Sequence, residues 1–239
     1  MIKRGNILAR TLHKWIGLIV GIQMLVWLLT GLYMVIVDID FIHGDPMVKD
    51  IQTAIAVPDT SGVTIAGLMK SYPDATHISL QTVMGETRFT VTTPDQRYLI
   101  DPDTAEVLSP LGEETVRAIA RFHFNGDSEI NNATLITADP PTEIQTRRLP
   151  LWRIDFDDRF STSFYIDPYN GKLATRRHQY WRIFDIFWML HIMDYESRSD
   201  VHNRLLITAQ VSGLAFAITG VWLLFYSFSA RRRQGDIAK

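Results

Sequence analysis

Three histidines lie at the edges of long apolar segments, where an imidazole can bind a metal. His13 lies two residues before an uncharged apolar run at residues 15–37, and His202 lies three residues before a second run at residues 205–228. His191 lies eleven residues before His202, with a turn-like ESRSD between them, so these two imidazoles could meet. A neutral imidazole is the form that binds iron or another metal. The sequence therefore predicts one site at His191 and His202 and a second site at His13.

Asp194 is predicted to support the site at His191. It lies three residues beyond His191, so its carboxylate could orient the imidazole by accepting a hydrogen bond. A structural role is the alternative for all three histidines, because a histidine at a membrane edge also contacts lipid headgroups or backbone carbonyls. The other histidines lack metal-ligand spacing; they are His43, His77, His123 and His178.

A second group of acidic residues has a simpler interpretation. Asp155 and Asp157 fall on the same side of a predicted strand as Arg153, and Asp158 follows directly. A cation site or an acid/base pair is one reading of this group. The alternation favours a solvated strand face instead.

The elements that would position the three histidines are two helices of membrane-spanning length, predicted at residues 15–37 and 201–228. At about 1.5 Å per residue, each uncharged run covers a hydrocarbon core of roughly 30 Å. Basic residues at 1–14 and 229–239 place both ends in the cytoplasm by the positive-inside rule. The middle, with 21 acidic and 13 basic side chains between residues 38 and 180, would then be exported. The first run lacks an Ala-x-Ala site, which disfavours a cleaved signal peptide.

Small residues line one face of each predicted span, and a histidine shares that face. The small residues are Gly17, Gly21 and Gly31 beside His13, and Ala209, Gly213 and Gly220 beside His202. The G-x-x-x-G pair in the first span lets another helix approach closely. Each histidine is followed 17 and 18 residues later by a Thr-Gly pair, although the two spans run in opposite directions. This spacing predicts an inverted pair of helices.

The exported middle is predicted to be an α+β module of two similar units, at residues 38–110 and 111–179. In each unit, a helix-like segment precedes segments that alternate polar and apolar residues, as half-buried antiparallel strands do. The turn sequences YLIDPDTAEVL and FYIDPYNGKLA repeat with a 66-residue offset, which favours an internal repeat. Gly171 suits the exit of such a turn, whereas the first copy has Ala105, so the two turns need not be alike.

A third apolar stretch, at residues 180–196, connects this module to the second span. It contains two aspartates and an arginine as well as Trp181, Trp188 and Tyr195. The mixture predicts an amphipathic helix that lies at the outer membrane surface.

The chain resembles a known family at these elements. A helix followed by an antiparallel sheet ending in YxIDPxxGxL resembles the PepSY domain. LHKWIGLIVGIQMLVWLLTGLYM is similar to the first helix of PepSY-associated transmembrane proteins, and MLHIMDY with RLLITAQVSGLAFAITGVWLL is similar to a later membrane segment of that family. The resemblance covers nearly the whole chain. Larger members, with four or more spans, include iron-regulated membrane proteins and inner-membrane reductases of ferric siderophores, some of which bind b-type haem through histidines.

This resemblance implies a protein of the bacterial inner (cytoplasmic) membrane with a periplasmic central module. It implies b-type haem at His13, His191 and His202, with Met189 and Met193 near the second of these. The expected role is an accessory redox subunit linked to ferric-siderophore reduction or uptake. The alternative is a non-catalytic PepSY scaffold or regulator that binds a periplasmic or membrane protein. The expected partners are the lipid bilayer and either a second copy of the chain or another membrane protein.

Composition excludes several other classes of function. The chain has no cysteine, which excludes disulfides, thiolate metal sites and thiol catalysis. It contains no phosphate-binding glycine loop, no G-x-S-x-G, no H-E-x-x-H and no dinucleotide fingerprint. Attraction to anionic lipids explains the basic tail, so no nucleic-acid partner is expected. No catalytic residue is predicted.

Overall fold

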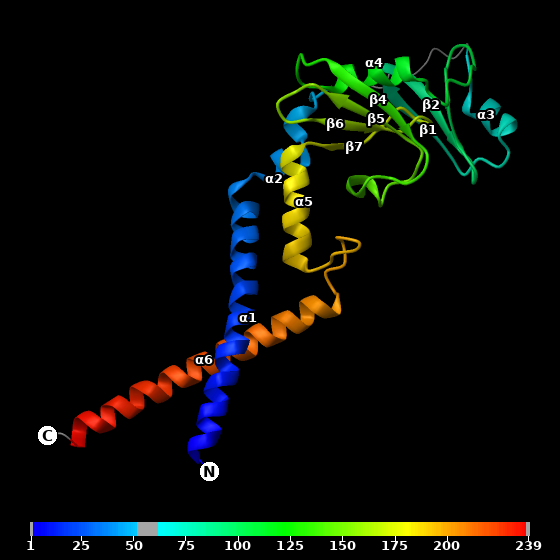
Figure 1. Cartoon of the computed structure of the whole chain (residues 1–239). Helices are drawn as coiled ribbons and strands as arrows, with labels where there is room; N and C mark the ends of the chain where they lie inside the picture. The colour runs from blue at the N-terminus through cyan, green and yellow to red at the C-terminus, as the bar shows by residue number, and fades with distance from the viewer. Residues whose placement is uncertain (1, 52–61, 238–239) are drawn as a thin grey trace. The chain divides into compact units, whose positions relative to one another are not determined.

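A computed structural model of the chain describes residues 2–51 and 62–237, and the side chains of residues 13–51 and 62–221 (Figure 1). The described residues form six α-helices, two short 3-10 helices and two antiparallel sheets, which confirms the predicted α+β class. They divide into two compact units. The helical unit comes from the two ends of the chain, up to Asp38 and from Ile183 onward, and the α+β unit is Ile39–Arg182.

The helical unit contains α1 (Ile2–Ile36), the later part of α5 (Gln179–Ile192) and α6 (Arg204–Ile237). Within it, the segments His13–Ile36 and Arg204–Val221 have mean hydropathies of 2.1 and 1.4. By length and composition, both are able to cross a membrane. Only 11% and 6% of their residues are buried, in contrast to the core helix of a soluble protein.

The helix boundaries differ from those predicted. Helix α1 already begins at Ile2, so the segment before the first span is helical as well. Helix α5 ends at Ile192, before the predicted limit of residue 196, because Met193 has a left-handed φ of 55°. Helix α6 begins at Arg204 and continues through most of the predicted tail. The Asn203 side-chain oxygen accepts a hydrogen bond from the backbone N–H of Leu206 at 2.8 Å, as an N-cap does.

The first half of the α+β unit packs one helix on a three-stranded sheet. Its elements are α3 (Ile65–Ser71), β1 (His77–Val83), β2 (Glu86–Thr92) and β3 (Arg97–Ile100), in the strand order β1-β2-β3. The Thr64 hydroxyl caps α3 by accepting from the Gly67 N–H at 3.1 Å. From the sequence alone, Thr60 or Ser61 would be the cap of this helix, and both lie outside the described residues. Leu68 of α3 is buried against Phe89, Val91 and Ile100 of the sheet.

The second half packs a helix on a four-stranded sheet. Its elements are α4 (Glu113–His123), β4 (Ile130–Ile136), β5 (Leu151–Phe156), β6 (Ser163–Ile166) and β7 (Leu173–Arg177), in the order β4-β5-β6-β7. Three short helices complete the unit: α2 (Ile39–His43), η1 (Asp45–Met47) and η2 (Thr142–Ile144). The shared core joins Val83 and Leu99 of the first sheet to Ile119, Ile154 and Phe164 of the second half. The two halves therefore fold as one unit.

The two repeated turns adopt the same conformation. In the first, the backbone N–H of Ala105 donates to the carbonyl of Asp101 at 3.1 Å; in the second, Gly171 donates to Asp167 at 2.8 Å. The φ angles are 61° at Ala105 and 67° at Gly171, so both residues are left-handed. A left-handed conformation costs glycine little and alanine more. The first turn therefore reproduces the second at the cost of local strain.

Candidate functional site

The site predicted at His191 is built by α5 and α1 within the helical unit. Imidazole Nδ1 lies 2.8 Å from the hydroxyl oxygen of Thr30, a residue that is only 3% exposed. The indole N–H of Trp27 donates to the backbone carbonyl of His191 at 2.9 Å. Gly31 lies beside the ring, since a Cβ added there would lie 3.8 Å from imidazole Cε1, an ordinary contact distance. These contacts fix the place and the orientation of the ring.

The hydrogen bonds of Thr30 bear on which nitrogen of His191 carries the hydrogen. The Thr30 hydroxyl donates to the carbonyl of Val26 at 2.9 Å, and the carbonyl oxygen of Trp27 lies 3.2 Å from the same hydroxyl oxygen. A hydroxyl has one hydrogen and two acceptor lone pairs, so a Thr30 hydroxyl that donates to Val26 accepts from Nδ1–H of the imidazole. Nε2 of the neutral ring then keeps its lone pair, which is the atom that a metal would bind.

His13 has a packing role in the same unit. Its ring stacks on Phe216 of α6, with the ring centroids 4.5 Å apart and an angle of 20° between the planes. Phe216 also fills the space above Gly17, where an added Cβ would lie 2.8 Å from the ring. The stack and the glycine therefore form one contact between α1 and α6.

The remaining small residues on the two faces differ in what they contact. A Cβ added at Gly213 would lie 4.0 Å from Val20, an ordinary contact distance, whereas one added at Gly21 or Gly220 would meet no described atom within 4 Å. Ala209 lines a cavity between α1 and α6. The close approach that the spacing predicted is thus found at Gly17.

His202 and Asp194 lie in the loop between α5 and α6. The His202 side chain is exposed, and its backbone N–H donates to Asp200 at 2.8 Å. The carboxylate of Asp194 accepts from the hydroxyl and backbone N–H of Ser197 and from the N–H groups of Glu196, Ser199 and Asp200.

The position of Asp194 corrects the role predicted for it. It shapes the loop, while Thr30 is the group that orients His191. The hydrogen bond from the Ser197 hydroxyl, together with those from the loop N–H groups, holds the pKa of Asp194 well below its usual value.

Among the described residues, His191 has a hydrogen-bonded and oriented ring, and His13 does not lie close to it. His13 and Thr30 are 17 residues apart on α1, which is about 25 Å along the helix axis, so His13 and His191 cannot share one iron. The 400 Å³ cavity between α1 and α6 is lined by Met24, Trp27 and Met193 among others, and none of the three histidines lines it. The described residues also include no cluster of three His, Asp or Glu side chains suited to a metal ion.

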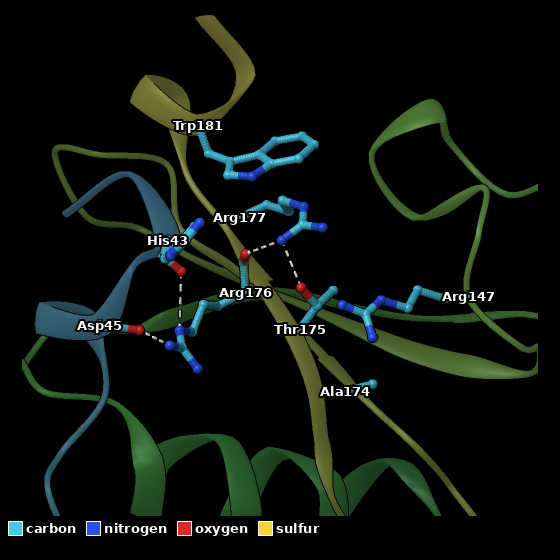
Figure 2. A pocket seen from close by; sticks show the side chains of 8 residues that line it. All are labelled: His43, Asp45, Arg147, Ala174, Thr175, Arg176, Arg177 and Trp181. Carbon is cyan, nitrogen blue, oxygen red and sulfur yellow. Dashed lines mark hydrogen bonds and ion pairs between the residues drawn. The ribbon is translucent and has the colours of Figure 1, made fainter. Parts of the chain in front are cut away.

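The α+β unit contains a second candidate site, an arginine-lined cavity of about 510 Å³ beside β7 (Figure 2). The residues that line it are His43, Asp45, Arg147, Ala174, Thr175, Arg176, Arg177 and Trp181. They come from four separate segments of the unit: the α2–η1 turn, the residues after η2, the strand β7 and the start of α5. Strand β7 is an edge strand of its sheet, so this side of it is open to a ligand.

Two of the three arginines are held in place by the surrounding chain. Arg176 forms an ion pair with Asp45 and donates from Nε to the carbonyl of His43 at 3.1 Å. The guanidinium of Arg177 lies 3.8 Å from the centre of the Trp181 ring and donates to the hydroxyl of Thr175 at 2.6 Å. Both contacts of Arg176 are drawn in Figure 2, which also shows the Trp181 ring lying over Arg177.

The sequence pattern alone does not predict this cavity. Its only local signal is the basic and aromatic stretch TRRHQYWR at residues 175–182, which continues into the predicted surface helix. Asp45 and Arg147 are distant in sequence from that stretch and reach it only through the packing of the α2–η1 turn and the η2 segment. Only the folded chain places Asp45 and Arg147 beside Arg176 and Arg177.

No family model, no curated protein and no solved structure matches this chain. The chemistry of the two sites follows from their residues. His191 offers an oriented nitrogen lone pair, which binds a metal or accepts a hydrogen bond. The arginine-lined cavity offers guanidinium groups, which bind carboxylate or phosphate.

Proposed function

We propose that this chain is a PepSY-type accessory protein of the bacterial inner membrane that presents His191 as an axial ligand to a b-type haem. Its role would be to assist a redox system linked to the reduction or uptake of ferric siderophores. Both ends of the chain would be cytoplasmic and the α+β unit periplasmic, as the basic residues at the two ends suggest.

The observation that carries this proposal is the hydrogen bond between His191 and Thr30. It orients the ring, and when the Thr30 hydroxyl donates to Val26 it places the imidazole hydrogen on Nδ1 and the lone pair on Nε2. Haem ligands are commonly histidines whose other ring nitrogen donates to a neighbouring group in this way. Bound haem would supply one-electron transfer. The second axial ligand would come from a second copy of the chain or from a partner membrane protein.

A visible absorption spectrum of the purified membrane protein tests the proposal. Protein from haem-replete cells should show a Soret band that sharpens on reduction with dithionite, and His191→Ala should lose it. His13→Phe is the matched control, because a phenyl ring preserves the stack on Phe216 and the Soret band should remain. A colourless but folded wild-type protein would refute haem binding.

A non-catalytic scaffold is the second candidate function, and a specific observation favours it. Two of the residues predicted to serve a redox site make structural contacts: the His13 ring stacks on Phe216, and Asp194 accepts hydrogen bonds from its own loop. Under this proposal, His191 only joins α5 to α1, and the α+β unit binds a partner protein. The wild-type protein would then be colourless, and His191→Ala would lower its thermal stability without any spectral change.

A further inference from the structure

We infer that the arginine-lined cavity beside β7 binds a phosphate group. This role is separate from the one proposed for His191, since all of the lining residues belong to the α+β unit. The ligand class follows from the charge, the construction and the size of the cavity.

The lining of the cavity is strongly cationic in a unit that is otherwise acidic. Three guanidinium groups face a single carboxylate, that of Asp45, which leaves a formal surplus of two positive charges among the lining residues. The surrounding chain, from residue 38 to residue 180, contains 21 acidic and 13 basic side chains. A phosphate monoester carries a charge of about −2 near pH 7, so it matches this surplus better than one carboxylate does.

Arg176 and Arg177 form a cationic wall of the cavity that the surrounding residues hold in place, and Arg147 is the third arginine of the lining. Arg176 is fixed by Asp45 and the α2–η1 turn, and Arg177 by Thr175, by Trp181 and by the carbonyl of Glu143 at 3.0 Å. Figure 2 shows Arg147 reaching toward β7 from the other side. A phosphate between Arg147 and the wall would receive guanidinium hydrogen bonds from two directions.

Arg147 is the residue that distinguishes a ligand site from an ordinary charged strand edge. Arginines on an edge strand can serve only to prevent pairing with another sheet. Arg147, however, comes from a different segment, and its exposed side chain has no hydrogen-bond or ion-pair partner among the residues described. At about 510 Å³, the cavity is within the usual range for small-molecule sites and holds more than a bare phosphate ion.

Two sources could supply this phosphate group: a soluble phosphate ester, or the headgroup of an anionic lipid. Isothermal titration of the full-length protein in detergent separates them, with glycerol 3-phosphate as the soluble probe and dioctanoyl phosphatidic acid as the lipid probe. Dioctanoyl phosphatidylcholine is the control for binding through the acyl chains. Arg147→Gln should weaken binding about tenfold, as expected for the loss of a charge-assisted hydrogen bond. Arg148→Gln is the matched control, because Arg148 is also exposed but lines a different cavity, and it should leave the affinity unchanged.

Each outcome bears on the inference. Binding of glycerol 3-phosphate that depends on Arg147 supports the site and identifies a soluble ester as its ligand. Binding of phosphatidic acid alone, with the same dependence, supports the site and identifies a lipid headgroup. The inference is overturned if neither probe binds, if phosphatidylcholine binds equally well, or if the two arginine variants weaken binding equally.

Discussion

The imidazole Nδ1 of His191 in α5 and the hydroxyl of Thr30 in α1 lie 2.8 Å apart, and the carbonyl of Val26 lies within hydrogen-bond distance of the same hydroxyl at 2.9 Å. The first of these is a polar contact between two largely apolar helices, of the kind that holds membrane helices together. Its strength and its direction can be measured separately. The strength tells whether His191 is needed for packing, and the direction tells whether Nε2 is available to a ligand.

Replacement of Thr30 by valine should remove this contact while keeping the shape of the side chain. Because the acceptor for Nδ1–H is lost, we expect a destabilisation of about 0.6 kcal/mol, the average for such bonds in membranes. Nitrogen-15 NMR of labelled histidine should show the Nδ1–H tautomer of His191 in the wild type and a mixture in Thr30→Val. Thr219→Val is the control, because among the described residues the Thr219 hydroxyl bonds to the carbonyl of Phe216 in its own helix. An Nε2–H tautomer in the wild type would contradict the assignment.

Gly17 is predicted to be the position at which α1 tolerates no side chain. A leucine at residue 17 would collide with the Phe216 ring and break its stack on His13, so we expect a loss of about 1–3 kcal/mol, as for an overpacked core. Gly21→Leu is the matched control and should be nearly neutral, because an added Cβ there meets no described atom within 4 Å. Thermal unfolding in detergent, followed by circular dichroism, measures both. Equal effects at residues 17 and 21 would show that α1 and α6 do not pack through Gly17.

Periodic features of the fold could be predicted from the sequence. The long apolar runs, the strand alternation and the 66-residue repeat led to the α+β class and to the turn that recurs at Asp101 and Asp167. Each of these signals is local, and hydrophobic patterning or turn chemistry is enough to read it. The helix ends were less predictable, since Asn203 and Met193 decide them through single contacts or dihedral angles.

Partners distant in the sequence could not be predicted. Proximity in sequence linked Asp194 to His191, whereas the structure pairs His191 with Thr30, 161 residues away. The arginine-lined cavity was missed for the same reason, because Asp45 and Arg147 join Arg176 and Arg177 only after folding. In each case the sequence shows which side chains are able to bind a ligand. It does not show which residues of one element pack against which residues of another.

Ala105 offers a direct test of the repeated turn. Ala105→Gly should stabilise the protein by about 0.5–1 kcal/mol, because glycine relieves the left-handed strain at φ 61°. Gly171→Ala should destabilise it by more than this, since the residue is left-handed as well and an added Cβ would lie 3.2 Å from Val83. Denaturant unfolding of the full-length protein measures both changes. A destabilising Ala105→Gly would show that the first turn carries no strain.

His178 is a buried imidazole that the fold holds in its neutral form. It is fully buried, and Nε2 donates to the carbonyl of Phe41 at 2.8 Å, with the carbonyl of Ile42 at 3.2 Å. Nδ1 is buried and has no hydrogen-bond partner among the described residues. Burial therefore lowers the pKa of His178 below its ordinary value of 6.5, and the charge of Arg182 lowers it further. The hydrogen bonds to the two carbonyls and the charge of Asp158 act to raise the pKa, but burial outweighs them.

Acid should destabilise the α+β unit through His178. The unfolded chain binds a proton near pH 6.5 and the folded chain only at lower pH, so stability is full above 6.5 and is lost as the pH falls below that value. The His123 imidazole, whose pKa burial also lowers, acts in the same direction. His178→Gln should reduce the difference in unfolding free energy between pH 7 and pH 5, measured by urea unfolding. An unchanged difference in this variant would exclude His178 as its source.

Glu143 anchors the start of α5 to the second sheet through a charged network. Its carboxylate accepts from Arg182 Nε at 2.7 Å and from the hydroxyl of Tyr165, while Arg182 also donates to Ser163 at 2.9 Å. Burial acts to raise the pKa of Glu143, but the hydrogen bonds from Arg182 and Tyr165 outweigh it and hold the pKa below its usual value. Glu143 is therefore ionised at pH 7.

Glu143→Gln should cost about 2 kcal/mol of unfolding free energy at pH 7, the usual value for a hydrogen bond to a charged group. The amide that replaces the carboxylate keeps its size but loses its charge, which leaves Arg182 poorly paired. Glu113→Gln is the matched control: Glu113 pairs with Arg117 on the exposed face of α4, and its loss should cost less than about 0.5 kcal/mol. Urea unfolding at pH 7 compares the two variants. Equal costs would mean that the network around Glu143 stabilises the fold no more than an exposed ion pair, because burial then adds nothing to its strength.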